Sequence, residues 1–592
     1  MVSAREKRRS NAAKNRRELI AAGFTRRDLV KMGLVTSGGW LIPKRGLSAR
    51  ALDSAGDDEG QTRSPFTTPF CERLVIMPVK TSVASLSPAP TAAPQSGEGR
   101  TRDHQDFARF PAQEFCEIVQ QPAFVSMSPD LPPQLIWGYD GITPGPTYVG
   151  RYGRPMLVRN HNRLSTVNGG FGKPSVSTHL HNSHSASESD GHPCDFFEIG
   201  EFYDHCYPNF PSGGDFDHEC MSTLWYHDHR VAFTSQNVYK GLAGFYLLYN
   251  ESDTGDETTG FHLPGVPNGT GGSDFDVPLL FGDKVFDPVD KLLFFDLFNL
   301  DGILGDKFTV NGKIQPFFQV HPRRYRFRLL NAGPSRFYQF FLTDSQDLNN
   351  TIPFWQISND GNLLPGPEQV TSTRISVAER MDVIIDFSNL AGKSIYLENR
   401  LVQTDGRAPK GGLTAAGAGN LVMRFDVVLP PVADNSQDPA IPGVHYYDLP
   451  PMEPTVITRR FRFDRTNGNW AVNGQLFDVC TPTNPATPRF RVKRNTAEKW
   501  IFQNSSGGWQ HPIHVHFEEF QMLSRNGVAP PRVERGRKDV ARLQFDEEIV
   551  VYFKFSDFIG QYPMHCHNVV HEDHEMMLSF DIDDEGDRRT EP

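Results

Sequence analysis

The chain has little cysteine, few charged residues and no long apolar segment. Seven cysteines in 592 residues are too few for a scaffold that disulfide bonds hold together. Because no run of about 18 uncharged apolar residues occurs, the sequence predicts no membrane-spanning helix. A net charge of −11 argues against nucleic acid as a partner. These features indicate a large globular protein. Its length indicates roughly three or four domains.

The first fifty residues differ from the rest in charge. They hold 13 Lys and Arg against three acidic residues, and the pair Arg26 and Arg27 precedes a mildly apolar stretch at 29–43. This pattern resembles a twin-arginine export signal over residues 1–51, so we expect export to the periplasm, the cell surface or the medium. A disordered basic tail on a cytoplasmic protein is the alternative. Since this segment carries ten net positive charges, the remaining body carries about −21.

The rest of the chain alternates short apolar runs with Gly, Pro and Asn turns. Runs such as 381–387 and 549–555 are dense in the β-branched and aromatic residues that strands favour. A Pro/Ser/Ala-rich linker at 81–100 and low-complexity loops at 250–273 and 403–419 interrupt these runs. We therefore predict an all-β chain of three packed β-sandwich or barrel units, at residues 65–250, 255–430 and 431–585.

Half of the 20 histidines gather in four short clusters. Residues two apart in a strand point to the same face, so each His-x-His pair presents two imidazoles side by side. One such pair is common on protein surfaces, but four pairs offer eight nitrogen ligands to metals. The clusters are His179-Leu180-His181, His227-Asp228-His229, His511-Pro512-Ile513-His514-Val515-His516, and His565-Cys566-His567 followed by His571 and Met576.

The last cluster predicts one strand that touches two metal sites. If the strand is extended, its two histidines face one side and the Cys566 thiolate faces the other. The Cys566 side can gather His511, His571 and a long weak bond from Met576, which is the ligand set of a blue copper centre. Zinc is the usual alternative, but structural zinc prefers four closed ligands with several cysteines. The pattern therefore favours copper, with a path of a few covalent bonds between the two sites.

These motifs, in this order, resemble the four copper signatures of the multicopper oxidase family, above all its three-domain bacterial type represented by spore-coat laccase, phenoxazinone synthase and bilirubin oxidase. The resemblance covers about residues 70–585 and includes 141–147, 224–229 and 378–382. It implies three cupredoxin-like Greek-key domains and four copper ions, with a trinuclear cluster between the first and third domains. It also implies ligand roles: type 1 copper, His511, Cys566, His571 and Met576; type 2 copper, His179 and His514; type 3 pair, His181, His227, His229, His516, His565 and His567.

Two acidic residues are candidates for catalysis, because reducing dioxygen to water consumes protons as well as electrons. Asp190 and Glu572 match positions where similar bacterial enzymes keep carboxylates near the trinuclear cluster. A buried carboxylate with a raised pKa can relay protons, so we expect both residues to do so. Surface or helix-capping acids are the alternative.

Several residues depart from the family pattern. Asn182 stands where the family usually has Gly after the second histidine. His184 and His192 add imidazoles nearby, and although another metal site or a channel is an alternative, we expect ordinary loop histidines. One disulfide is expected after export, between two of three cysteines in a variable loop, Cys194, Cys206 and Cys220.

The resemblance implies an oxidase that takes electrons singly from a small reducing substrate and delivers four of them to dioxygen, making water. Met576 as an axial ligand predicts a type 1 copper of low to moderate potential, which suits phenols, aminophenols and bilirubin-like compounds. A metallo-oxidase of ferrous, cuprous or manganous ions is the alternative. An acidic patch beside His511, to which Glu518 and Glu519 would contribute, would favour it. The absence of a Met-rich insert among 13 methionines argues against a cuprous oxidase.

Two further classes fit less well. An inactive copper-binding or assembly protein would not need complete ligand sets. A copper nitrite reductase, with two cupredoxin domains, lacks four His-x-His pairs in one chain. The sequence leaves the physiological substrate and the oligomeric state open.

Overall fold

The computed structural model describes residues 64–592, except 267–273, 298, 467 and 479. The predicted export signal at residues 1–51 lies outside this part. Strands dominate the described residues, so the prediction of an all-β chain is confirmed. Their helical segments are α3 (Thr234–Lys240), α4 (Val569–Asp573) and the single 3-10 turns η1 (Ser212–Gly214) and η2 (Arg532–Glu534). No helix among the described residues is long and apolar enough to span a membrane.

The described strands form six sheets, two in each of three successive units. The first unit, residues 114–249, has the sheet orders β2-β1-β4-β6 and β3-β8-β7-β5. In it β1 pairs in parallel with β4, so the chain crosses between the sheets instead of forming a simple meander. The strands are β1 (Glu114–Val125), β2 (Gln134–Tyr139), β3 (Gly145–Arg151), β4 (Met156–Asn162), β5 (Thr178–His181), β6 (Phe202–Tyr207), β7 (Thr223–Asp228) and β8 (Ala243–Tyr249).

The second unit, residues 276–426, has larger sheets and supplies none of the predicted ligands. One sheet runs β12-β11-β9-β14-β20-β17-β18 with β10 beside β9, and the other runs β13-β22-β21-β15-β16 with β19 beside β15. The strands are β9 (Asp276–Phe286), β10 (Leu293–Phe294), β11 (Lys307–Val310), β12 (Lys313–Ile314), β13 (Phe317–Gln319), β14 (Arg324–Asn331), β15 (Tyr338–Asp344), β16 (Thr351–Ile352), β17 (Phe354–Asn359), β18 (Asn362–Val370), β19 (Thr373–Ile375), β20 (Arg380–Asp386), β21 (Ser394–Asn399) and β22 (Asn420–Asp426).

The third unit, residues 455–583, carries the second half of the histidine clusters. Its sheets run β24-β23-β26-β31-β28-β29 and β25-β33-β32-β27-β30. The strands are β23 (Thr455–Thr466), β24 (Asn469–Val472), β25 (Arg491–Lys493), β26 (Thr496–Asn504), β27 (His511–Val515), β28 (Phe520–Arg525), β29 (Arg537–Lys538), β30 (Val540–Leu543), β31 (Glu548–Phe555), β32 (Gly560–Cys566) and β33 (Met577–Asp583).

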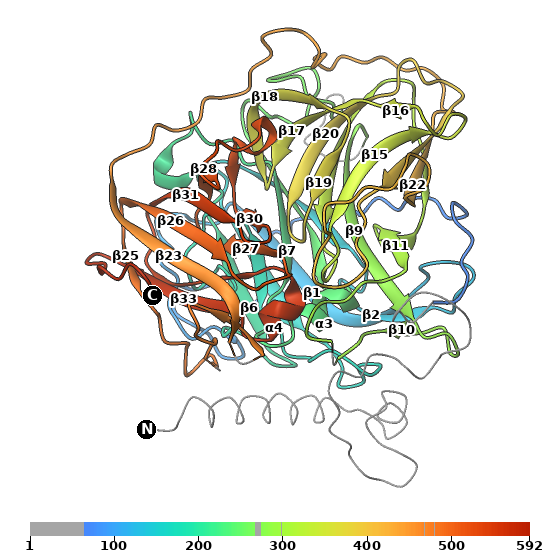
Figure 1. Ribbon diagram of the computed structural model, residues 1–592. Coiled ribbons are helices and arrows are strands. Elements are labelled where there is room, and N and C mark those ends of the chain that lie inside the picture. Colours follow the sequence, from blue (N-terminus) through green and yellow to red (C-terminus); the bar gives the residue numbers. More distant parts are fainter. Residues whose placement is uncertain (1–63, 267–273, 298, 467, 479) are drawn as a thin grey trace.

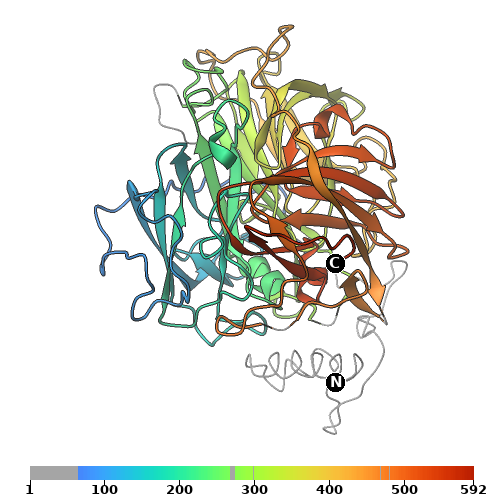
Figure 2. The ribbon, with the colours of Figure 1, turned by 90° about the vertical axis from the view of Figure 1, so that its left-hand side faces the viewer.

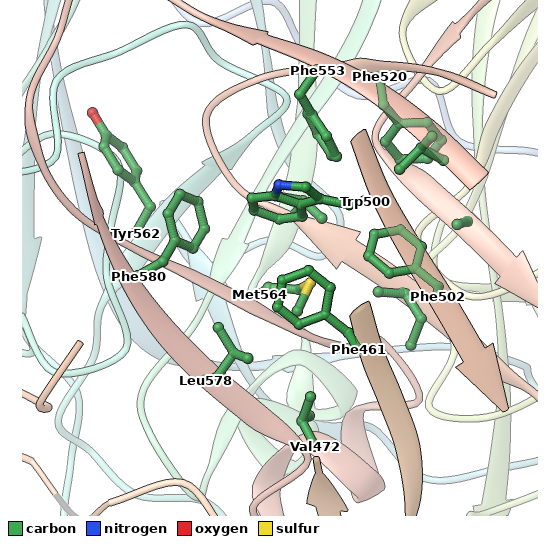
Figure 3. Close-up of a cluster of buried hydrophobic side chains, with 14 of the residues drawn as sticks. Phe461, Val472, Trp500, Phe502, Phe520, Phe553, Tyr562, Met564, Leu578 and Phe580 are labelled. Carbon is green, nitrogen blue, oxygen red and sulfur yellow. The ribbon is translucent and has the colours of Figure 1, made fainter. Parts of the chain in front are cut away.

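Alternation along the strands builds the core that holds the last cluster in place. In β23, Phe461 and Phe463 point inward and are fully buried, whereas Arg460 and Arg462 point outward and are exposed. Phe461 packs with aromatic and aliphatic side chains of the facing sheet (Figure 3). Cys566 belongs to the same buried cluster. Since interiors are close-packed, this core fixes the position of the Cys566 strand.

The three units pack around a common centre. In Figure 1 the third unit, orange to red, lies on the left and the second, yellow-green, on the upper right. Figure 2 shows the first unit, blue to teal, facing the third across the molecule. The short helices α3 of the first unit and α4 of the third pack against each other at this joint. The histidine clusters lie on strands that face the same joint.

A disulfide bond also ties the first unit to the third, and it corrects the predicted pairing. Cys194 pairs with Cys480, 286 residues further along the chain, and not with another cysteine of its own loop. Cys206 and Cys220 are free. The sequence could not reveal this bond, because the two cysteines meet only when the first and third units pack together.

Candidate metal centres

The register between β27 and β32 sends ligands to opposite faces of one sheet. In this antiparallel pair Ile513 lies opposite Cys566, and His514 lies opposite His565. Because side chains alternate along a strand, His511 points to the same face as Cys566. His514 and His565 point to the other face, toward the first unit. The predicted division of one strand between two sites therefore follows from the pairing itself.

The first unit supplies its histidine pairs from β5 and β7, and they meet those of the third unit. His179 lies opposite His227 in this antiparallel pair. Across the joint the ring centroids of His179 and His516 are 3.8 Å apart, and those of His181 and His514 are 3.7 Å apart. Within each His-x-His pair the rings lie 4.7–5.5 Å apart, side by side as predicted.

The buried histidines form overlapping groups in which several nitrogens converge. Nε2 of His229, His516 and His565 lie 3.1–3.2 Å from one another. Three imidazole nitrogens this close together suit lone pairs directed at one ion. A second group, His179, His514 and His516, shares His516 with the first, and a third, His179, His181 and His227, shares His179 with the second.

Backbone carbonyls hold the outward nitrogens of the cluster. Nδ1–H of His179 donates to the carbonyl of Asp190, and Nδ1–H of His514 donates to that of Asp539. These bonds select the tautomer in which Nε2 carries the lone pair. Among the described residues, Nε2 of both rings and both ring nitrogens of His567 are buried without a hydrogen-bond partner. Buried unpaired nitrogens are costly unless something binds them, so this donor set fits copper.

Cys566, His511 and His571 form a separate buried group with the opposite tautomers. Cys566 Sγ lies 3.4 Å from Nδ1 of His511 and 3.6 Å from Nδ1 of His571, and the two Nδ1 atoms are 3.3 Å apart. Their Nε2 atoms point outward instead, to the Ser506 hydroxyl at 2.9 Å and the Asp301 carbonyl at 2.9 Å. The Nδ1 lone pairs therefore face the thiol.

Met576 lies beside this group. Its backbone N–H donates to the carbonyl of His571 at 3.1 Å, and its carbonyl accepts from the N–H of Cys566 at 3.0 Å. The side chain is fully buried in the core of the third unit. One Cys, two His and a neighbouring Met make the donor set of a blue electron-transfer copper site.

Burial sets the protonation of these ligands. It lowers the pKa of His227 and of His511 to about 3, so both rings are neutral and keep a free lone pair at neutral pH. Burial also raises the pKa of the Cys566 thiol. A bound cation reverses this preference, because it stabilises the thiolate directly.

Asp190 and Glu572, the predicted proton relays, both contact ligand imidazoles. Nδ1–H of His516 donates to Asp190 Oδ2 at 2.7 Å. The two Glu572 oxygens lie 3.2 Å from Nδ1 of His229 and 3.1 Å from Nδ1 of His565. Both acids are buried, which excludes the surface alternative, and burial raises the pKa of Asp190. Their positions allow them to orient the rings and to hold protons behind the cluster.

A third carboxylate, which the sequence motifs did not indicate, lies at the cluster. Asp539 Oδ2 lies 3.1 Å from Nε2 of His181, and the carboxylate forms a bidentate ion pair with Arg380 at 2.8 and 2.9 Å. Burial raises the pKa of Asp539 to about 7. The sequence shows only a run of three charged residues, Arg537-Lys538-Asp539. The structure shows that this run is buried, and buried charges require partners of opposite charge. Arg380 is the partner of Asp539. This ion pair gives a structural role to one residue of the family-like stretch at 378–382.

Asn182, which replaces the usual Gly, has a backbone φ of +74°. This left-handed conformation favours Gly, but Asn tolerates it better than most residues do. Its side-chain amide donates to the carbonyl of Asp360 at 3.0 Å and to Glu519 Oε1 at 2.6 Å. Asn182 therefore links the first unit to the second and the third directly beside His181.

His184 and His192 stand apart from the metal-ligating groups found among the described residues. His184 Nε2 lies 3.0 Å from Asp557 Oδ2, and His192 Nε2 lies 3.0 Å from the Ser579 hydroxyl. Both histidines are buried and connect their loop to the third unit.

Glu518 and Glu519 do not form an acidic surface patch beside His511. Both are buried. Glu518 accepts hydrogen bonds from the Ser212 hydroxyl at 3.0 Å and from a backbone N–H, and Glu519 pairs with Arg537 at 2.8 Å. Their burial means that these two residues do not supply the acidic patch that would favour the metallo-oxidase alternative.

Known proteins are similar to this chain in sequence and in fold. The family described as "Multicopper oxidase" matches residues 448–586. A bilirubin oxidase from Albifimbria verrucaria is 35% identical over 477 residues, which span 79% of this chain and 76% of the relative. A laccase from Bacillus stratosphericus is 31% identical over 523 residues, spanning 80% and 95%. A solved laccase structure from Pediococcus acidilactici aligns with a TM-score of 0.68 at 21% identity, covering 89% of this chain and 97% of that one.

Fold, donor groups and relatives agree on the class: the protein is a copper-dependent oxidoreductase that uses dioxygen as electron acceptor. The chain belongs to the multicopper oxidase family. The predicted architecture of three cupredoxin-like units is confirmed as well.

Proposed function

We propose that this multicopper oxidase is laccase-like and couples four one-electron oxidations of phenolic, aminophenolic or bilirubin-like substrates to the reduction of dioxygen to water. The observation that supports this proposal is that one short stretch of chain serves two sites. The Cys566 thiol faces His511 and His571. Its chain neighbours face the histidine cluster: His565 groups with His229 and His516, and the His567 ring lies 5.2 Å from that of His181. The names of two relatives, bilirubin oxidase and laccase, support this choice of substrates.

We assign four copper ions to these ligands. Copper, when bound, would accept single electrons from the substrate at the Cys566 site and supply dioxygen with four electrons at the histidine cluster. The chain connects the two sites through the Cys566 backbone and the flanking His565 and His567. The assigned ligands are His511, Cys566, His571 and Met576 for type 1; His179 and His514 for type 2; and His181, His227, His229, His516, His565 and His567 for the type 3 pair.

The buried carboxylates handle the protons that dioxygen reduction consumes. Asp190 holds Nδ1–H of His516, and Glu572 lies within 3.2 Å of Nδ1 of His229 and of His565. Burial raises the pKa of Asp190, which favours a protonated carboxyl next to the cluster. A group in this state can release a proton where charge accumulates.

Substrate reaches the Cys566 site from the side of His571. The Nε2–H of His571 donates to the carbonyl of Asp301, and the Asp301 side chain is partly exposed. Asp301 belongs to a loop of the second unit, so this unit forms part of the substrate wall. Outer-sphere electron transfer requires only that the substrate comes close to His571. Organic reductants therefore do not have to enter the core.

The proposal is tested by anaerobic mixing of the copper-loaded protein with separate reductants: o-aminophenol, 2,6-dimethoxyphenol, bilirubin, and ferrous, cuprous and manganous ions. We expect fast bleaching of the blue absorption by the organic compounds and its return on admitting air. Bleaching by metal ions alone would replace this proposal with a metallo-oxidase. A Cys566→Ser variant serves as the control without a blue band.

We further propose that the protein is exported by the twin-arginine route, from the residue pattern at 1–51. Fractionation of a bacterial host that expresses the native chain and an Arg26→Lys, Arg27→Lys variant tests this. We expect the native protein outside the cytoplasm and the variant inside. Equal export of both would contradict the proposal.

A further inference from the structure

Two tryptophans and two arginines cover the outer side of the Cys566 site. The Trp470 ring lies 4.0 Å from the ring of His571. The Arg465 guanidinium is 4.2 Å from the centre of the Trp470 ring and 4.6 Å from that of Trp509, and the Arg407 guanidinium is 4.7 Å from that of Trp509. Cation–π contacts at these distances orient both guanidinium groups over the indoles.

The arrangement follows from the strands and loops that meet here. Trp470 lies opposite Arg465 in the β23–β24 pair, so both face inward at the end of the third unit's sheet. The indole N–H of Trp470 donates to the carbonyl of Leu300 at 2.8 Å, which locks the ring against a loop of the second unit. Arg407 lies in another loop of the second unit. Its backbone carbonyl accepts from the N–H of Gln510.

The cluster carries more positive than negative charge. Its acidic member, Asp301, lies 3.0 Å from Arg465 and 3.4 Å from Arg407, so one carboxylate faces two guanidinium groups. Nε of Arg465 is buried and has no hydrogen-bond partner among the described residues. The side chains of Arg407, Asp301 and Arg465 are 47%, 33% and 26% exposed, so solutes reach them. This excess stands out on a chain of net charge −11.

We propose that Arg407 and Arg465, together with Trp509, bind the anionic group of an aromatic reducing substrate, namely a carboxylate or sulfonate on the ring to be oxidised. Guanidinium groups recognise such anions through paired hydrogen bonds. The partly buried Trp509 offers its ring for stacking, and the Trp470 ring lies 5.3 Å from that of Trp509 and 4.0 Å from that of His571, so it connects the two. The inference rests on the proposed oxidase function and narrows its substrates to anionic aromatics.

The same charges disfavour metal ions as substrates. A ferrous or manganous ion would have to approach two guanidinium groups with one carboxylate, which already pairs with both. Phenols without charge gain nothing from the arginines but still stack on Trp509. The arginines therefore select among organic reductants rather than enabling oxidation itself.

Equilibrium binding tests the site without turnover. We would titrate the copper-loaded, oxidised protein with 2-naphthoate and with its neutral analogue 2-naphthamide, neither of which reduces copper readily. Native protein should bind the carboxylate more tightly, and Arg407→Gln and Arg465→Gln should each weaken it by about two- to fivefold, the range of exposed ion pairs. Affinity for 2-naphthamide should not change.

Arg462→Gln is the matched control. Arg462 lies on the same strand as Arg465, is 52% exposed in its side chain and pairs with Asp464. An equal loss of 2-naphthoate affinity in this control would mean that general charge, not the site, attracts the anion, and would overturn the proposal. Equal affinity of native protein for the acid and the amide would overturn it too.

Turnover gives a second readout. For syringic acid, a phenol with a carboxylate, Arg465→Gln should raise KM by about the same factor as the Kd for 2-naphthoate and leave kcat unchanged, whereas KM for 2,6-dimethoxyphenol should stay constant. The native preference should shrink as salt is added. If the native protein binds 2-naphthoate as expected but oxidises none of the organic reductants, the proposed oxidase function is refuted and the anion site is not. Equal KM changes for both phenols would refute the anion site alone.

Discussion

Replacing Asp190 by Asn separates proton delivery from simple support of the copper ligands. Asp190 holds two ligand rings: its backbone carbonyl accepts from His179, and its side chain accepts from His516 at 2.7 Å. The backbone bond survives any substitution, and the amide oxygen of Asn can still accept from His516. The variant should therefore keep the geometry of the cluster and lose only the group that releases a proton.

The expected effect is large in one step and absent from the others. General acid–base catalysis typically contributes about 10²–10⁴-fold to a rate. We expect Asp190→Asn to slow reoxidation of the reduced protein by dioxygen by about 100-fold or more. Copper content, the blue absorption and its anaerobic bleaching by substrate should stay at native values, because Cys566 and its partners are untouched.

Stopped-flow mixing of fully reduced protein with dioxygen measures this step, and Asp557→Asn is the control. Asp557 is a largely buried acid of the third unit that also contacts an imidazole, Nε2 of His184 at 3.0 Å, but His184 belongs to none of the four histidine clusters. Native reoxidation by a fully loaded Asp190→Asn protein would refute the proton-relay role. Loss of copper by the variant would instead mean that Asp190 acts by holding His516 in place.

Three further predictions address other parts of the structure. Met576→Leu should raise the reduction potential of the blue site, since it removes a weak axial donor; an unchanged potential in a spectroelectrochemical titration would show that Met576 is not a ligand. Arg380→Met leaves Asp539 buried without its cation and should cost about 3–5 kcal/mol, seen as a lower midpoint in denaturant unfolding; an unchanged midpoint would contradict it. Burial lowers the pKa of Lys240 from 10.5 to about 7, so its charge destabilises the folded protein most at and below pH 7, and this cost fades as pH rises toward 10.5. Lys240→Met should therefore raise Tm at pH 7 by more than at pH 9, and a gain that is equal at both pH values would be inconsistent with the shift.

The sequence was enough to predict that the histidine clusters converge, because chain spacing and strand alternation act locally. Each His-x-His pair keeps its rings side by side wherever its strand lies, and the cysteine between two histidines must face the other way. The all-β fold was predictable for the same reason, from runs such as 549–555, where alternate residues are buried.

Features that depend on how the units pack were not predictable. Cys194 meets Cys480, and Arg380 meets Asp539, only across unit boundaries. Glu518 follows the ligand cluster closely in sequence, yet its side chain is buried against Ser212 of the first unit. The arginine and tryptophan cluster likewise needs two loops of the second unit, and no spacing in the chain indicates that they meet.

The central claim is that the strand bearing Cys566 serves two copper sites at once. The most direct test measures copper content and visible absorption of the native protein and of Cys566→Ser, each after copper loading. We predict four ions and a blue band for the native protein, and three ions without the blue band or substrate oxidation for the variant. A blue band that survives in Cys566→Ser would contradict the account.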